Sequence, residues 1–252
     1  MNSTPRRRAS AFFFPISEIS PTSASTLTDP STRLLFDSWL WVLFNKERSK
    51  RNRAKFTNHI PDKRIRSALP VPVTDCTVGD LRAIRDSIAQ TPEGGALVFI
   101  IALINYASAE NHQAGVKMAI LSMWEENIVE SNAAGNLNGY VLHRSDAERL
   151  NRANMAIAAS YVAGTAPEND YTIPDPTSIE IGFRAQSEYS GSEASGTKKV
   201  FVWSSGADTA RPLTLKRNVN GVWKVAEFSS LVVGVRPPAS EGRPAERAAN
   251  AL

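Results

Sequence analysis

The sequence predicts an α+β fold in which about four N-terminal helices pack on a small C-terminal antiparallel sheet of three to four strands. Between residues 77 and 164 the apolar residues recur at helical spacing, and from residue 178 they alternate with polar residues. Asn220 and Gly221 separate two alternating segments, as in a two-residue hairpin turn of type I′. Regular periodicity begins only after about residue 70, which favours a single domain over residues 71–238.

The helices are predicted from their start signals and their apolar spacing. They are expected at residues 77–89, 95–108, 110–130 and 145–164. Thr77 and Asp80 have the spacing of a capping box, and Thr91 followed by Pro92 is typical of a helix start. The second helix contains the run ALVFIIALI and has no polar face, so we expect it to lie at the centre of the core.

The strands are predicted from alternation with a period of two residues. Ile179, Ile181 and Phe183 alternate with polar residues, and the same pattern recurs in KKVFVW, RPLTLKR and VWKVAEF. The segment 186–198 is expected to be a long polar connection. Residues 239–252 have no pattern and are expected to form a disordered tail.

Residues 1–70 are expected to form a flexible basic leader. They hold 13 Lys and Arg residues against 5 Asp and Glu, whereas residues 71–238 hold 14 against 18. The first 32 residues are rich in Ser, Thr and Pro, a composition that does not bury enough apolar surface to fold. Whether residues 1–33 are a true part of the protein is left open. The single cysteine, Cys76, cannot form an internal disulfide, which indicates a cytoplasmic location.

The apolar run at residues 34–44 predicts a short helix in the leader. It spans 11 residues, and a helix needs about 20 to cross a bilayer. Aromatic residues beside a cationic run are typical of contact with an anionic membrane surface. The candidate contact residues are Trp39, Trp41, Lys46, Arg48, Lys50 and Arg51. The alternative is that the helix packs on the domain and the charges are solvated.

Catalytic motifs are missing from the sequence. It contains no GxxxxGK[ST], GxGxxG, HExxH or GxSxG pattern. Three histidines and one cysteine are too few for a structural zinc site, so neither a metal nor a cofactor is expected. His143 and Asp146 have the spacing of an imidazole and its orienting carboxylate, although His143 also fits a surface loop. We therefore assign no catalytic residue.

The stretch from Trp203 to Pro238 holds the candidate binding surface. A turn can bring Asp208 and Arg211 within pairing distance, and Ser229 and Ser230 follow the end of a strand. With Arg236, these residues are candidates to bind an anion or a peptide carboxylate through an arginine fork. The alternative is a structural ion pair with turn capping.

The same stretch resembles a bacterial family of uncharacterised proteins that is known only as a domain of unknown function. The resemblance rests on TDCTVGDLRAI at 74–84, YVAGTAPENDYTIPDP at 161–176 and the closing pattern SGAD..RP.TLK....GVWK..EFSSL.VG.RPP. It covers about residues 74–238 and implies no activity. It does imply that eight residues belong to one motif, namely Gly206, Asp208, Arg211, Pro212, Trp223, Ser229, Ser230 and Arg236.

These observations favour a non-catalytic cytoplasmic interaction module with another protein as partner. One alternative is a small-ligand binder or enzyme with a pocket between the helices and the sheet. Another is a peripheral membrane protein at the inner face of the membrane, anchored through residues 34–66. A nucleic acid is the least favoured partner, because the leader lacks aromatic residues interleaved with its cations and the domain is acidic.

Overall fold

The computed structural model of the chain describes residues 63–185 and 190–241. The helix predicted at 34–44, the six candidate membrane-contact residues and the predicted tail from residue 242 onward lie outside the described residues. The description below concerns the compact unit that contains residues 63–241.

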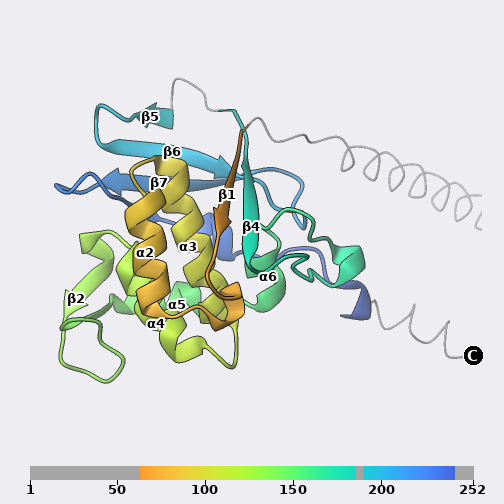
Figure 1. The fold of residues 1–252 in the computed structure, drawn as a ribbon, viewed down its shortest axis with the longest axis horizontal. Helices are drawn as coiled ribbons and strands as arrows, with labels where there is room; N and C mark the ends of the chain where they lie inside the picture. The colour runs from red at the N-terminus through yellow and green to blue at the C-terminus, as the bar shows by residue number, and fades with distance from the viewer. Residues whose placement is uncertain (1–62, 186–189, 242–252) are drawn as a thin grey trace, which may run out of the picture. The chain divides into compact units, whose positions relative to one another are not determined.

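The predicted α+β architecture is confirmed. Its helices are α2 (Val78–Ile88), α3 (Pro92–Ala107), α4 (His112–Ser122), α5 (Arg144–Leu150) and α6 (Met155–Ala159). The strands of the main sheet are β1 (Lys63–Ala68), β4 (Ser178–Phe183), β5 (Gly191–Ser192), β6 (Thr197–Val202), β7 (Arg211–Arg217) and β8 (Trp223–Glu227). Figure 1 shows α2 and α3 beside each other, next to the strands of this sheet.

The main sheet is antiparallel throughout and has the strand order β1-β4-β6-β7-β8, with the short β5 paired to β6. A separate hairpin is formed by β2 (Ile128–Glu130) and β3 (Tyr140–Leu142). Short 3-10 helices occur at Val73–Asp75, Glu125–Asn127, Pro167–Asn169, Ser229–Val232 and Ala239–Glu241. The sheet therefore combines one strand from before the helices with five from after them.

Helix α3 is the centre of the core, as predicted. Every residue from Pro92 to Tyr106 is buried, and the helix contacts β1, β6, β7 and β8 as well as α2, α4 and α6. The Phe99 ring lies 5.4 Å from that of Phe228, between their centroids. Phe99 and Val202 belong to the same hydrophobic core. Helices and sheet thus share one core.

Local signals place the first helix starts correctly. The Thr77 side chain accepts a hydrogen bond from the Asp80 backbone, and the Asp80 side chain accepts one from the Thr77 backbone, which completes the capping box. The Thr91 side chain caps α3 in the same way through Gly94. These partners lie within one helical turn, so the sequence pattern is sufficient to predict them.

The helix predicted at 110–130 is too long. Helix α4 ends at Ser122, where the chain becomes extended and Trp124 N donates to Val225 O at 2.7 Å. Met123 forms a parallel bridge with Val225 of β8. Pairing with a distant strand replaces the helical hydrogen bonds, and residues 128–130 become β2 instead of a helix end.

The helix predicted at 145–164 is divided. Helix α5 ends at Leu150, and α6 begins after Asn154, whose side chain accepts a hydrogen bond from Ile157 N at 2.9 Å. An asparagine satisfies a helix start better than a helix interior, so the chain restarts at this cap. The apolar spacing of the two short helices resembles that of one long helix.

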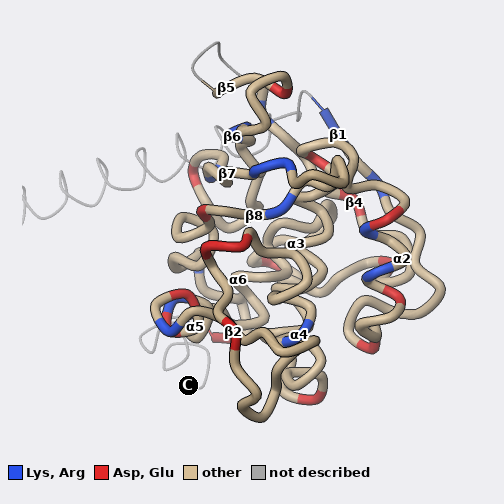
Figure 2. The backbone as a smooth tube through the Cα atoms, turned by 90° about the vertical axis from the view of Figure 1, so that its left-hand side faces the viewer, with Lys and Arg blue, Asp and Glu red and all other residues tan. Residues whose placement is uncertain are grey.

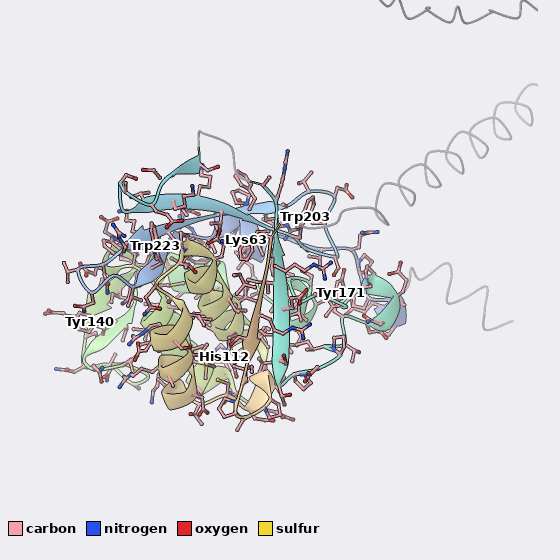
Figure 3. The ribbon with its side chains drawn as sticks, turned by 45° about the horizontal axis from the view of Figure 1, so that its top comes forward. Lys63, His112, Tyr140, Tyr171, Trp203 and Trp223 are labelled. Carbon is pink, nitrogen blue, oxygen red and sulfur yellow. The ribbon has the colours of Figure 1, made fainter. Side chains whose placement is uncertain are left out.

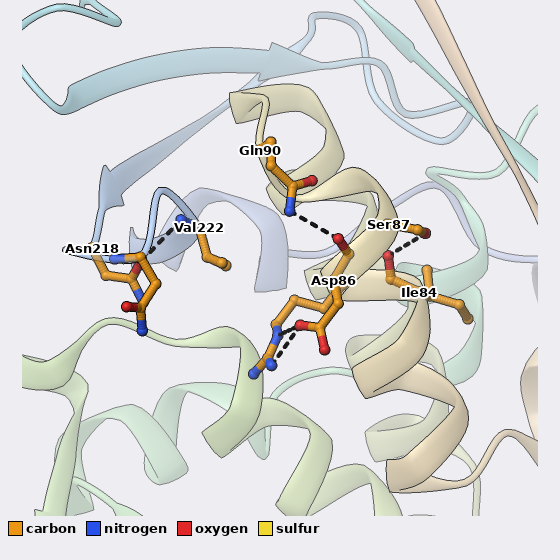
Figure 4. Close-up of polar contacts among 8 residues, drawn as sticks. Ile84, Asp86, Ser87, Gln90, Asn218 and Val222 are labelled. Atoms are coloured by element: carbon orange, nitrogen blue, oxygen red, sulfur yellow. Dashed lines mark hydrogen bonds and ion pairs between the residues drawn. The ribbon is translucent and has the colours of Figure 1, made fainter.

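The hairpin around Asn220 and Gly221 is confirmed, but its turn is not type I′. The loop runs from Asn218 to Val222, and only Gly221 has a positive φ, of 80°. The Asn218 carboxamide accepts hydrogen bonds from Asn220 N at 3.1 Å and Val222 N at 2.9 Å (Figure 4). This side-chain turn lengthens the loop beyond two residues.

Two strands of the main sheet lie where none was predicted. Lys63–Ala68, which the sequence analysis assigned to the leader, forms β1 and pairs with β4. The short β5 lies in the predicted polar connection 186–198. The sequence did not predict β1, because the side chains of Arg64 and Arg66 are exposed and give this segment the basic composition of the leader, although Ser67 is buried.

Candidate functional site

Arg211 is at the centre of the polar contacts made by the closing segment. One guanidinium nitrogen, Nη1, donates to the Tyr161 hydroxyl at 3.1 Å and to the Val233 carbonyl at 2.8 Å. The other, Nη2, donates to the Gly234 carbonyl at 2.7 Å. The arginine fork predicted to bind an anion therefore holds the main chain that follows the last strand.

The Tyr161 hydroxyl completes this contact. It donates to the Leu231 carbonyl at 2.6 Å while it accepts from Arg211. Burial raises the pKa of Tyr161 to about 12, against a smaller lowering effect of the Arg211 charge. The phenol thus stays neutral at physiological pH, and its proton is used in the bond to Leu231.

A second group of contacts holds the chain end at Arg236. The Tyr171 hydroxyl donates to the Arg236 carbonyl at 2.6 Å, and Arg236 N donates to the Gly206 carbonyl at 3.0 Å. Arg236 Nη2 donates to the Ser205 carbonyl at 3.0 Å. A Cβ on Gly206 would lie 2.7 Å from Val235 Cβ and still closer to the Tyr171 hydroxyl, so only glycine fits here. Figure 3 shows Tyr171 on the side of β4 where this segment passes.

Buried hydroxyls join the turn that contains Ser204 and Ser205 to the end of α6. Ser160 Oγ and Ser204 Oγ are 2.8 Å apart, and Ser205 N donates to the Ser160 carbonyl at 2.8 Å. Thr165 Oγ1 donates to the Ala159 carbonyl at 2.9 Å.

We call Tyr161, Tyr171, Gly206, Arg211 and Arg236 the closing clamp. Its two tyrosines lie in the segment that carries the family resemblance, but their partners are too far away in the chain to be predicted.

The remaining candidate binding residues lie elsewhere on the surface. Asp208 is exposed, and no ion pair or hydrogen bond joins it to Arg211 among the residues that the structure describes. Ser229 is also exposed, and its backbone N–H donates to Glu227 Oε1 at 2.8 Å. Ser230 is half-buried in the 3-10 helix Ser229–Val232. The predicted pairing of Asp208 with Arg211 is therefore replaced by bonds from Arg211 to carbonyls.

His143 and Asp146 do not act as a pair. His143 is the N-cap of α5, with Nδ1 2.9 Å from Ser145 Oγ. Asp146 is buried, where it accepts hydrogen bonds from Asn127 Nδ2 at 3.0 Å and Arg149 Nη1 at 3.1 Å. The carboxylate therefore joins α5 to the start of β2 and does not orient the imidazole. Sequence reasoning did not single out Asn127, whose partner is far along the chain.

Within residues 63–185 and 190–241, no cluster of three or more His, Cys, Asp or Glu side chains is arranged to hold a metal ion. In the same part of the chain, no helix is long and apolar enough to cross a membrane.

A model of the DUF6935 family, a domain of unknown function, matches residues 75–239. The chain belongs to this family. Neither a curated protein nor a solved structure matches the chain significantly. The match covers the helices α2–α6, the strands β2–β8 and the closing clamp, while β1 precedes it. The DUF6935 domain therefore completes its main sheet with a strand from outside the matched residues.

The two edge strands of the main sheet, β8 and β1, differ in the hydrogen bonding of their outward backbone groups. At β8, Trp223 N donates to the Ala89 carbonyl at 2.7 Å, and the Val225 carbonyl accepts from Trp124 N at 2.7 Å. The chain after α2 and the chain after α4 thus cover this edge. A covered edge offers little main chain for pairing with another protein.

At β1 the outer edge is open among residues 63–185 and 190–241. Ile65 pairs with Ile181 and Ser67 with Ile179, and Leu69 N donates to the Thr177 carbonyl at 2.7 Å. Because backbone groups alternate in direction along a strand, the odd-numbered residues bond to β4 and the even-numbered ones point away from it. The N–H and C=O groups of Arg64 and Arg66 therefore point off the sheet, and within the described residues they have no backbone partner.

The side chains at this edge are basic. One carboxylate, Glu180, accepts bonds from Arg64 Nη1 at 2.9 Å and from Arg66 Nη2 at 3.1 Å. The hydrogen bond from Arg64 is the main cause that lowers the pKa of Glu180. Lys63 lies on the other face, with Nζ 2.9 Å from Glu93 Oε1 at the start of α3. Figure 2 shows these basic positions along β1 beside the acidic position in β4.

Proposed function

We propose that the DUF6935 domain of this chain is a non-catalytic protein interaction module and that the outer edge of β1 is its binding surface. The observation that carries this proposal is the contrast between the two edges of the sheet. Ala89 and Trp124 cover the backbone of β8, whereas the outward backbone groups of Arg64 and Arg66 have no backbone partner in the described part of the chain. An open strand edge is a common attachment point for another chain.

The polar side chains of the closing clamp support a non-catalytic role. Arg211 and Tyr161 bond main-chain carbonyls of the same domain. A contribution to stability therefore accounts for the place of Arg211 in the motif. His143 caps a helix, and the neighbouring carboxylate of Asp146 is bonded elsewhere. Nucleophilic catalysis of the triad type needs a nucleophile, a base and an orienting group in mutual reach. Arg211, Arg236, His143 and Asp146 are used instead for internal contacts.

The membrane alternative has no specific support from the described residues. Most of the residues that it needs lie outside them. The last basic residues of that segment, Lys63, Arg64 and Arg66, belong to β1 and form ion pairs with Glu93 and Glu180.

The proposal is tested by removing charge from the edge of the full-length protein. Arg64→Gln/Arg66→Gln changes the edge, and Arg144→Gln/Arg152→Gln is a matched control on the exposed surface of α5 and the turn after it. Immobilised wild-type, edge and control proteins are incubated with an extract of source cells, and retained proteins are quantified by mass spectrometry. Each protein that the edge variant loses is then purified, and its affinity is measured directly.

We expect at least one purified partner to bind the wild type and the control equally and the edge variant at least tenfold more weakly. A tenfold loss of affinity corresponds to about 1.4 kcal/mol of binding free energy. Circular dichroism and thermal unfolding confirm that all three proteins are folded. If every retained protein binds the edge variant as tightly as the wild type, β1 is not the binding surface and the proposal fails.

A further inference from the structure

We propose that β1 binds an extended acidic segment of a partner protein by strand addition, so that the segment lengthens the main sheet beyond β1. This inference rests on the proposed function and specifies the chemistry of the partner. It follows from the direction of the backbone groups, from the charge at the edge and from the sequence of the rest of the chain.

The backbone of β1 offers a complete set of hydrogen bonds to an added strand. Arg64, Arg66 and Ala68 are the even-numbered residues, so their N–H and C=O groups point away from β4. Successive outward residues lie two positions apart, which is the repeat that an extended peptide needs. The inward bonds of Ile65 and Ser67 hold β1 in place without using the outward groups.

The side chains next to these backbone groups favour acidic residues. Arg64 and Arg66 share Glu180, so two guanidinium groups are neutralised by one carboxylate. Their side chains are 54% and 67% exposed, whereas that of Glu180 is only 16% exposed. In an added strand, every second side chain lies beside Arg64 or Arg66 on the outer face. Carboxylates at those positions would complete the charge pairing.

The other positions of the added strand face the side of the sheet that covers the core. Their neighbours in β1 are Ile65, which is half-buried, and Ser67, which is 5% exposed. Small or β-branched apolar side chains suit such a surface. The expected pattern in the partner is thus an acidic residue at every second position with apolar residues between.

The same charges disfavour the other occupants that the chain itself offers. A second copy that paired through β1 would place Arg64 and Arg66 opposite arginines, and like charges directly opposite are destabilising. The 62 residues before β1 hold ten Lys and Arg against five Asp and Glu. Residues 242–252 hold two Arg and one Glu. Neither segment is acidic, which leaves a segment of another protein.

The test uses two peptides of alternating sequence, one of Glu and Val and one of Lys and Val, added to the full-length protein. Binding is followed by hydrogen exchange of individual amides. We expect the Glu–Val peptide to slow exchange at Arg64 and Arg66 at least tenfold. The amides of Ile65 and Ser67 are already bonded to β4 and should change much less. The Lys–Val peptide should leave all four amides unchanged.

Two substitutions separate backbone pairing from simple charge attraction. Arg66→Pro removes an outward N–H and a charge, while Arg66→Ala removes the charge alone. Proline is tolerated at an edge position whose N–H faces solvent, so the ladder to β4 is kept. We expect the Glu–Val peptide to bind Arg66→Pro at least tenfold more weakly than Arg66→Ala. Equal affinity for the two variants, or equal affinity of the wild type for the two peptides, would overturn strand addition by an acidic segment.

This outcome is distinct from that of the proposed function. If the edge variant loses a natural partner but no amide of β1 is protected by the Glu–Val peptide, the surface stands and strand addition fails. If the Glu–Val peptide binds as expected but no natural partner depends on the edge, strand addition stands and the proposed function fails.

Discussion

The guanidinium of Arg211 lies 3.1 Å from the hydroxyl of Tyr161, and this contact joins the first residue of β7 to the segment that follows α6. Each partner also holds the chain after β8, Arg211 through Val233 and Gly234 and Tyr161 through Leu231. Three segments that are distant in the sequence are thus fixed at one point. The role of the closing clamp is therefore open to measurement through stability.

Replacing Arg211 should destabilise the domain. Arg211→Ala removes three hydrogen bonds from a charged donor and should lower the free energy of unfolding by about 2–3 kcal/mol. Arg211→Lys should recover less than half of this loss, because an ammonium group cannot reproduce the fork. Urea unfolding measures both effects. Arg144→Ala is the control, since its side chain is 91% exposed, and it should change stability by less than about 0.5 kcal/mol. Equal losses for Arg211→Ala and Arg144→Ala would contradict a structural role for Arg211.

Adding a methyl group at Gly206 should also be costly. Gly206→Ala places Cβ against the Tyr171 hydroxyl and Val235, and overpacking of this kind costs about 1–3 kcal/mol. In a Tyr171→Phe background the hydroxyl is absent, so the cost of Gly206→Ala should fall by about 1 kcal/mol. A double-mutant cycle of urea unfolding measures this coupling. Gly79→Ala in α2, where the nearest atom is 3.6 Å away, should not destabilise the domain. Additive effects of the Gly206 and Tyr171 changes would show that the contact is relaxed in solution.

Pairing of β1 with β4 should weaken in acid. The hydrogen bond from Arg64, followed by that from Arg66, lowers the pKa of Glu180 from 4.5 against the raising effect of its burial. A carboxyl with a lowered pKa in the folded state stabilises that state above its ordinary pKa, and the stabilisation is lost as the pH falls through the lowered value. Hydrogen exchange of the Ile65 and Ser67 amides, corrected for the intrinsic pH dependence, should therefore speed up below about pH 4.5. In the Glu180→Gln variant, the Ile65 and Ser67 amides should exchange faster at neutral pH, and their exchange should lack the additional increase in acid. If the increase is unchanged in this variant, another titrating group causes it.

The start of α6 should depend on one side chain. Asn154→Ala removes the acceptor for Ile157 N and should lower the free energy of unfolding by about 1 kcal/mol, the usual cost of losing an N-cap. Thermal and urea unfolding measure the change. Asn220→Ala is a matched control, since Asn220 is exposed in the loop between β7 and β8. A loss as large for Asn220→Ala as for Asn154→Ala would mean that the cap contributes nothing specific.

Short-range chemistry explains which elements could be predicted. The capping box of Thr77 and Asp80 and the N-cap at Thr91 act within one helical turn, so residue types and spacing suffice. The apolar run of α3 is buried because no arrangement of that helix can expose a polar face. Strands β4, β6, β7 and β8 follow from alternation, which is also local.

Contacts between distant segments explain what was not predicted. Helix α4 stops at Ser122 because Trp124 bonds the edge of β8, and the basic segment Lys63–Ala68 becomes a strand because β4 pairs with it. Asn127 and Asp146 likewise find each other only in the folded chain. No pattern in the neighbouring residues identifies such partners.

The sequence by itself determined that the helices precede most of the main sheet, where α2 and α3 start and which helix is the centre of the core, because hydrophobic period and capping depend on neighbouring residues. Only the tertiary structure decided that Arg211 bonds carbonyls and that no other described segment pairs with the outer edge of β1. An arginine side chain or a strand backbone can form hydrogen bonds with a ligand, with another chain or with its own chain. Which of these partners it has depends on the groups that folding brings within about 3 Å.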